Sequence, residues 1–193
     1  MMMLPSHGQG WVEVICGPMF SGKTEELIRR VRRAKFAKQR VLVFKPLIDN
    51  RFAVEKVVSH SEQEYQARPL NYSYEVFDSG AMNESPKVVA FDEAQFFDPD
   101  LIEVVDRLAA QGRRVIVAGL DLDSNALPFG PMPQVMARAE YITKLQSVCM
   151  GCGEPGSRTF RTVESTEQVV IGGSESYKTL CRPCYLSATS SRL

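Results

Sequence analysis

The chain has 193 residues, of which 44% are hydrophobic and 24% are charged, as is typical of a folded globular protein. Its 23 Lys and Arg balance 23 Asp and Glu, so we expect neither a nucleic-acid partner nor an anionic membrane surface. The apolar runs are far shorter than the ~20 residues of a membrane helix, and residues 1–10 lack a signal-peptide pattern. These features exclude disorder along the whole chain and predict a cytoplasmic protein with one domain and an appendage.

The first two thirds of the chain alternate short apolar runs with helix-like segments. In chain order, the sequence predicts a strand at 12–16, a helix at 25–38, strands at 41–45 and 87–91, a helix at 100–110, and strands at 114–118 and 142–147. Several of these strands are continuously apolar, which is typical of a parallel sheet covered on both faces. We therefore predict an α/β fold.

Three other segments qualify this pattern. Residues 46–66 carry many charges and predict a loop or hairpin, and three prolines exclude a continuous helix across 121–133. The helix expected at 25–38 carries a basic cluster, which we interpret as a solvated face: Arg29, Arg30, Arg32 and Arg33.

Residues 17–24 match G-x-x-x-x-G-K-[ST] at every fixed position, between a predicted strand and a predicted helix. In such a loop, backbone N–H groups and the helix N-terminus bind polyphosphate. We expect Lys23 to contact the β and γ phosphates and the Thr24 hydroxyl to bind Mg²⁺. The predicted ATP contacts are Gly17, Pro18, Met19, Phe20, Ser21, Gly22, Lys23 and Thr24.

Two carboxylates follow the strand predicted at 87–91. We assign Asp92 to Mg²⁺ and Glu93 to accepting the proton of the group that attacks the γ phosphorus. The alternative is that both residues cap the next helix. The motifs predict a nucleoside triphosphate but leave the acceptor open, because water would make the protein an ATPase and an alcohol would make it a kinase.

Four cysteines form two C-x-x-C units separated by 28 residues: Cys149, Cys152, Cys181 and Cys184. Two such units supply the four thiolates of a structural zinc site, with a redox pair as the alternative. The apolar run 168–171 and the glycines after it fit either a loop that clamps a flat ligand or an ordinary ribbon turn. We interpret Cys16 as a buried residue of the first strand. The expected divisions are a tail (1–10), a nucleotide-binding domain (11–147), a zinc domain (148–186) and a second tail (187–193).

In this order, the motifs resemble those of the cellular-type (type II) thymidine kinases, from about Trp11 to Tyr185. The resemblance also covers residues 49–51, 92–97, 127–130 and 171–173 with Tyr177. It implies a RecA-like P-loop core with a parallel sheet and a small C-terminal zinc domain whose lasso loop covers the nucleoside. It further implies a homotetramer that transfers the γ-phosphoryl of ATP to the 5′-hydroxyl of thymidine, and also of deoxyuridine, in nucleotide salvage.

Site residues follow from the same resemblance. It implies that Glu93 is the general base, assisted by Lys23. It places further triphosphate and metal contacts at Asp49, Asn50, Arg51, Asp92 and Gln95. It places nucleoside contacts at Met19, Phe96, Leu120, Phe129, Thr159, Gln168, Val169, Val170, Ile171, Gly172 and Tyr177.

One departure and one rival accompany this interpretation. The chain has Ser124 and Asn125 where many relatives carry an aromatic residue and then a basic or polar one. The rival is a P-loop ATPase with a zinc ribbon acting on DNA, in which Glu93 would activate water. If the kinase interpretation holds, we expect zinc removal to loosen the nucleoside clamp before it affects the ATP loop.

Overall fold

A computed structural model describes residues 8–47, 56–58, 64–78, 80–163 and 175–190. Its central element is a six-stranded sheet in which all neighbouring strands are parallel. In spatial order the strands are β5 (Arg68–Leu70), β2 (Val41–Pro46), β6 (Val88–Phe91), β7 (Arg114–Gly119), β1 (Trp11–Cys16) and β8 (Tyr141–Lys144). The α/β class predicted from the apolar runs is confirmed.

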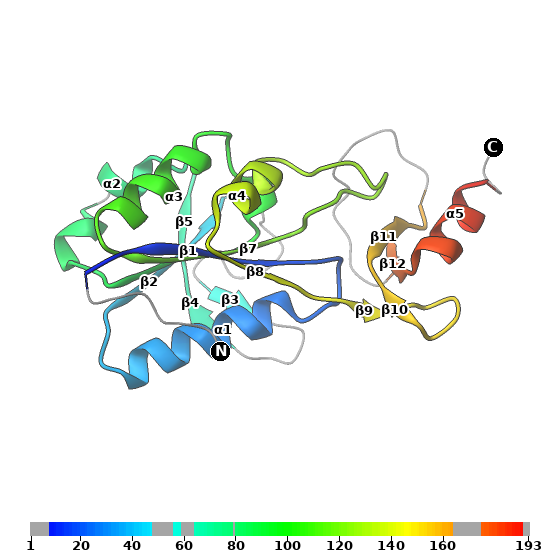
Figure 1. Ribbon diagram of the computed structural model, residues 1–193, viewed down its shortest axis with the longest axis horizontal. Coiled ribbons are helices and arrows are strands. Elements are labelled where there is room, and N and C mark those ends of the chain that lie inside the picture. Colours follow the sequence, from blue (N-terminus) through cyan, green and yellow to red (C-terminus); the bar gives the residue numbers. More distant parts are fainter. Residues whose placement is uncertain (1–7, 48–55, 59–63, 79, 164–174, 191–193) are drawn as a thin grey trace.

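Helices cover both faces of the sheet (Figure 1). One face packs against α1 (Lys23–Phe36) through Leu27, Ile28, Val31 and Ala34. The other face packs against α2 (Glu75–Asp78), α3 (Leu101–Ala110) and α4 (Met132–Arg138). Two short 3₁₀ helices, η1 (Ala81–Glu84) and η2 (Ala94–Phe96), precede and follow β6.

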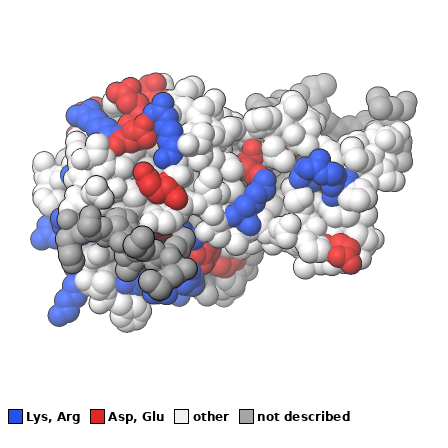
Figure 2. All heavy atoms as spheres, in the orientation of Figure 1, with Lys and Arg blue, Asp and Glu red and all other residues white. Residues whose placement is uncertain are grey.

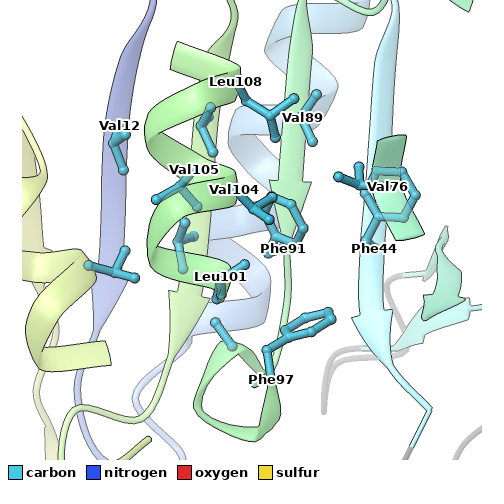
Figure 3. Packing of buried hydrophobic residues seen from close by; sticks show 14 of the residues in the cluster. Val12, Phe44, Val76, Val89, Phe91, Phe97, Leu101, Val104, Val105 and Leu108 are labelled. Carbon is cyan, nitrogen blue, oxygen red and sulfur yellow. The ribbon is translucent and has the colours of Figure 1, made fainter. Parts of the chain in front are cut away.

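Successive residues of a strand pack alternately into the hydrophobic cores on the two faces of the sheet. In β6, Val89 and Phe91 face α3, whereas Val88 and Ala90 face α1. Figure 3 shows Leu101, Val104, Val105 and Leu108 of α3 directed at the strands. Burial on both faces is why these strands lack a polar alternation.

Most predicted element boundaries lie within two residues of the observed ones. The expected strand at 142–147 is the exception, since it divides into β8 and β9 (Ser147–Val148). The Leu145 N–H still donates to the Cys16 carbonyl at 2.8 Å, and β9 then pairs antiparallel with β10 (Pro155–Gly156). The chain leaves the sheet at this point because its hydrogen-bonding partner changes.

Other sequence expectations have mixed outcomes. In 46–66, β3 (Lys56–Val58) and β4 (Glu64–Gln66) pair antiparallel, which confirms a hairpin there. Between residues 121 and 131 there is no continuous helix, but α4 begins at Met132, because prolines are tolerated in a first turn. The basic face of α1 is only partly solvated, since Arg30 pairs with the buried Glu13 at 2.8 Å.

A second lobe, which we call the cysteine lobe, contains the described residues from 147 to 190. It consists of β9, β10, β11 (Arg158–Arg161), β12 (Tyr177–Leu180) and α5 (Arg182–Ser190). In Figure 1 it projects beyond one end of the sheet. Helix α5 continues past residue 187, where the sequence analysis placed the start of a tail.

Figure 2 shows acidic and basic side chains interspersed over the larger lobe. In the described part of the chain, no helix has the length and apolarity needed to cross a membrane.

The two-faced core predicts a contrast between two leucines. Leu108 of α3 is fully buried, whereas Leu186 of α5 is 57% exposed. Leu108→Ala should lower the free energy of unfolding by about 2–5 kcal/mol, because it removes buried methyl groups and leaves a cavity. The control Leu186→Ala should change it by less than about 0.5 kcal/mol. Urea unfolding followed by circular dichroism measures both, and equal effects would contradict the assigned packing.

Candidate active site and cysteine centre

The phosphate loop, residues 17–24, connects β1 to α1. Gly17 has φ 137°, and a Cβ there would overlap the Leu145 carbonyl oxygen, so only glycine fits. Gly22 adopts the left-handed conformation immediately before the helix. The loop is braced internally, because the Ser21 hydroxyl and the Lys23 ammonium both donate to the Pro18 carbonyl, at 2.8 and 2.6 Å. The first N–H groups of a helix have no partner within the helix, so the start of α1 offers donors to an anion.

Opposite charges meet beside this loop. Loss of hydration lowers the pKa of Lys23, and the nearby carboxylates of Glu93, Asp92 and Asp121 oppose that change. Burial and the neighbouring Glu93 raise the pKa of Asp92 to about 8, against the opposing effects of Lys23 and Lys45. Asp92 is therefore a buried carboxylate whose ionised form a bound cation would stabilise.

Glu93 follows Asp92 in a different backbone setting. Its φ of 52° is unusual for a residue other than glycine, and such conformations concentrate at functional sites. Although Glu93 occupies the N-cap position of η2, its side chain forms no capping hydrogen bond there. Its carboxylate instead accepts a hydrogen bond from the Gln95 side-chain amide at 2.6 Å. For Glu93, the capping alternative is therefore not what the structure contains.

Gln95 connects Glu93 to the end of β7. Its amide nitrogen donates to Glu93, and its amide oxygen accepts the Leu120 N–H at 2.9 Å. Gly119 and Gly130 pack so closely that a Cβ on either would collide with Gln95 atoms. The side chain that the sequence analysis assigned to ATP thus lies buried between Glu93 and Leu120.

The predicted nucleoside residues of the larger lobe lie around the ends of β6 and β7. Phe96 and Phe129 contact each other edge to face, with ring centroids 5.5 Å apart. Leu120 is half-buried at the end of β7. The segment after it is braced by Asp123, whose carboxylate accepts the N–H groups of Asn125 and Leu127, both at 2.9 Å.

Within the described residues, hydrogen bonds join the cysteine lobe to this region at Ser124 and at Met19. The Tyr185 hydroxyl donates to the Ser124 carbonyl at 2.9 Å. Met19 of the phosphate loop donates its N–H to the Thr159 hydroxyl at 3.0 Å. Its carbonyl accepts the Thr179 hydroxyl at 2.8 Å. Thr159, a predicted base contact, therefore touches the phosphate loop directly.

The two C-x-x-C units converge on one point of the cysteine lobe. The four sulfur atoms all lie within 4.8 Å of one another, and the sulfurs of Cys152 and Cys181 are 3.6 Å apart. A tetrahedral zinc with ~2.3 Å Zn–S bonds requires sulfurs about 3.8 Å apart, so the spacing suits that ion. This group of four, the cysteine centre, could hold a metal.

The pKa values of the thiols at the cysteine centre shift in different directions. Backbone N–H donors, led by that of Cys181, lower the pKa of Cys149, whereas the neighbouring thiols raise the pKa of Cys184. Four thiols cannot all ionise at such distances unless a cation compensates their charge. By contrast, Cys16 lies fully buried in β1, and burial raises its pKa to about 11, which confirms its interpretation as a strand residue.

Some predicted site residues lie outside the part of the chain that the structure describes. Asp49, Asn50 and Arg51 lie outside the described residues, as do Gln168, Val169, Val170, Ile171 and Gly172. Tyr177 is described, and it lies buried in β12 opposite Arg161.

The sequence analysis missed two charged residues beside the site. Lys45 is 7% exposed near the end of β2, and Asp121 is 6% exposed just after β7. The Asp121 carboxylate lies 2.6 Å from the ammonium of Lys144, the last residue of β8. Lys45 and Asp121 both follow apolar strand residues at the carboxyl edge of a parallel sheet, where ligands bind in such folds. That position was the signal that could have identified them.

The chain is similar to a known protein family in sequence and to solved structures in its fold. Residues 10–185 match the family model described as Thymidine kinase. Among solved structures, the flagellar accessory protein FlaH from Methanocaldococcus jannaschii shares the fold, with a TM-score of 0.53 and 13% identity over 77% of this chain and 76% of that chain. The Legionella pneumophila ATPase DotB is more distant, with a TM-score of 0.43 and 16% identity over 67% of this chain and 34% of that chain. Because the family match spans most of its length, the chain belongs to the thymidine kinase family.

Proposed function

We propose that this nucleoside kinase transfers the γ-phosphoryl of ATP to the 5′-hydroxyl of thymidine, and also of deoxyuridine. The observation that carries the proposal is the Glu93 carboxylate, which Gln95 orients at 2.6 Å beside the charged groups of the phosphate loop. A base fixed next to a phosphate site suits deprotonation of an alcohol acceptor. Membership of the thymidine kinase family supports a nucleoside as that acceptor.

The triphosphate would occupy the loop from Gly17 to Thr24. Lys23 now donates to the Pro18 carbonyl at 2.6 Å, and a phosphate oxygen would replace that partner. This exchange favours binding, because an ammonium–phosphate contact is charge-assisted. We propose that Asp49, Asn50 and Arg51 add contacts to the same triphosphate.

The residues present suit Mg²⁺ as well as the nucleotide. Mg²⁺ prefers oxygen ligands, and we propose that the Thr24 hydroxyl and the Asp92 carboxylate hold it. The raised pKa of Asp92 supports this assignment, since a buried carboxylate without a cation retains its proton more readily. When bound, Mg²⁺ neutralises charge on the β and γ phosphate oxygens.

Glu93 and Lys23 would then share the work at the reacting atoms. Phosphoryl transfer depends mainly on positioning and charge neutralisation, so Lys23 stabilises charge on the transferred group. Glu93 accepts the proton of the 5′-hydroxyl as its oxygen bonds to the γ phosphorus, while the bond from that phosphorus to the bridging oxygen breaks and ADP leaves. Gln95 limits the rotation of that carboxylate by holding one of its oxygens.

The nucleoside would lie between the two lobes. We propose that Met19, Leu120, Phe96, Phe129, Thr159 and Tyr177 surround it, with main-chain groups of residues 168–172 bonding the base. A base held by main-chain hydrogen bonds is discriminated strongly, because a wrong base leaves polar groups unpaired. We further propose that the cysteine centre holds structural zinc and that the enzyme is a homotetramer.

The first test concerns the acceptor. Purified protein incubated with labelled ATP, Mg²⁺ and each nucleoside separately should place phosphate on thymidine and deoxyuridine but not on cytidine, as thin-layer chromatography would reveal. Parallel reactions with single-stranded DNA and no nucleoside should release little phosphate. ATP hydrolysis that requires DNA and ignores nucleosides would overturn the proposal in favour of a DNA-dependent ATPase.

The second test concerns the proton acceptor. Glu93→Gln keeps the shape of the side chain but removes its basicity, so kcat should fall by about 10²- to 10⁴-fold. The Kd for Mg-ATP should change by less than about twofold, since the charge of the loop lysine is retained. Calorimetry and steady-state kinetics measure these two quantities.

A surface glutamate provides the matched control. Glu84 pairs with Arg68 at 2.5 Å, and both side chains are about half exposed. Glu84→Gln should leave kcat and the Kd for Mg-ATP unchanged, because exposed ion pairs contribute little. Near-normal turnover in Glu93→Gln would remove Glu93 from its assigned role.

A further inference from the structure

Both main-chain polar groups of Met19 are held by one pair of threonines. Its N–H donates to the Thr159 hydroxyl at 3.0 Å, and its carbonyl accepts the Thr179 hydroxyl at 2.8 Å. Thr159 and Thr179 lie opposite each other in the register of β11 and β12. The cysteine lobe therefore holds the phosphate loop through main-chain atoms of the loop, and these hydrogen bonds do not depend on the side chain at position 19.

Thr179 also contacts the cysteine centre. Its carbonyl accepts the N–H of Met150, at 2.8 Å, and Met150 lies between the first pair of cysteines. Cys181 follows two residues later in the chain. One residue thus bonds the phosphate loop through its hydroxyl and the first C-x-x-C unit through its backbone.

The surroundings of Thr179 leave it little freedom to move. The residue is fully buried, and its methyl group packs against Gly156, where an added Cβ would lie 2.8 Å from it. The loop that it holds is itself strained, because Phe20, next to Met19, has φ 61°. A bulky residue keeps such a conformation only when its surroundings impose it, and the Thr179 hydroxyl holds the carbonyl of the peptide group that precedes Phe20.

We propose that Thr179 is a positioning residue that couples the cysteine centre to the phosphate loop, so that an intact centre sets the affinity of the loop for ATP. The proposal rests on the proposed function only in taking ATP as the occupant of residues 17–24. It argues against the expectation that zinc loss loosens the nucleoside clamp first. Because Thr179 contacts both the cysteine centre and the phosphate loop, a change at the centre alters the loop at the same time.

The hydroxyl of Thr179 is tested by two substitutions of that residue. Thr179→Val keeps the shape but leaves the Met19 carbonyl without its donor, which should weaken Mg-ATP binding by about tenfold. Thr179→Ser restores the hydroxyl and should return the Kd to within about threefold of the wild-type value. Zinc content should stay unchanged in both variants. Unaltered ATP affinity in Thr179→Val, or no rescue by serine, would overturn the proposal.

A matched control removes a hydroxyl elsewhere in the same lobe. Thr189 of α5 donates to the Tyr185 carbonyl within its own helix, at 3.0 Å. Thr189→Val should leave the Kd for Mg-ATP unchanged. An equal weakening in Thr189→Val would mean that the lobe responds to any lost hydroxyl, and this would contradict a specific role for Thr179.

Coupling is measured by a double-mutant cycle with Cys152→Ser. This substitution should weaken Mg-ATP binding by about tenfold in the wild-type background but by less than about twofold when Thr179→Val is already present. Hydrogen exchange of residues 17–24 without nucleotide should accelerate in each single variant, and no further in the double variant. Multiplicative effects on the Kd, or unchanged exchange of the loop in Cys152→Ser, would overturn the coupling.

These measurements separate the failure of this proposal from that of the proposed function. Hydrogen exchange needs no nucleotide, so it reports on the link even if the wild-type protein does not bind ATP. Should Thr179→Val fail to fold by circular dichroism, exchange of the loop in Cys152→Ser still decides the proposal. Absence of ATP binding with intact coupling would overturn only the proposed function.

Discussion

The site depends on charge collected at the carboxyl edge of a parallel sheet. Lys23 loses hydration there, which by itself disfavours its ammonium form, and the carboxylates of Asp92, Glu93 and Asp121 compensate. The compensation is mutual, because Lys23 opposes the rise in the pKa of Asp92. A buried ammonium or carboxylate without a partner of opposite charge would carry a large desolvation cost at this edge. The parallel order of β6, β7 and β1 is what brings these residues to one edge.

This balance of charge explains why the two lobes must keep fixed positions relative to each other. A loop that carries a desolvated lysine cannot drift from its carboxylates without leaving charges uncompensated. The larger lobe restrains the start of the loop, because the Leu145 carbonyl lies so close to residue 17 that only glycine fits there. The cysteine lobe fixes its middle, because the Met19 N–H donates to the Thr159 hydroxyl and the Met19 carbonyl accepts the Thr179 hydroxyl. The lobe that contains the four cysteines therefore restrains the phosphate loop, even before a nucleoside is considered.

Local signals in the sequence were sufficient for the features that depend on few residues. The apolar runs predicted the strands, the residues from Gly17 to Thr24 predicted the loop, and the C-x-x-C spacing predicted the clustered sulfurs. Features set by distant contacts were not accessible in this way. Nothing near Thr179 indicates that its hydroxyl bonds Met19, which lies 160 positions away. The division of the last strand into β8 and β9 likewise depends on where its partner β1 ends.

Asp92 and Glu93 are adjacent in the chain, but their backbone conformations place the two carboxylates in different surroundings. Asp92 still follows the path of β6, since its N–H donates to the Phe44 carbonyl of β2 at 2.9 Å. Its side chain is consequently buried at the sheet edge, near the charges of Lys23 and Lys45. Glu93 adopts φ 52°, which ends the strand and turns its longer side chain toward Gln95. A residue in an ordinary strand conformation would place its carboxylate on the opposite face of the sheet, so the φ of 52° explains how both adjacent acids come to lie near Lys23.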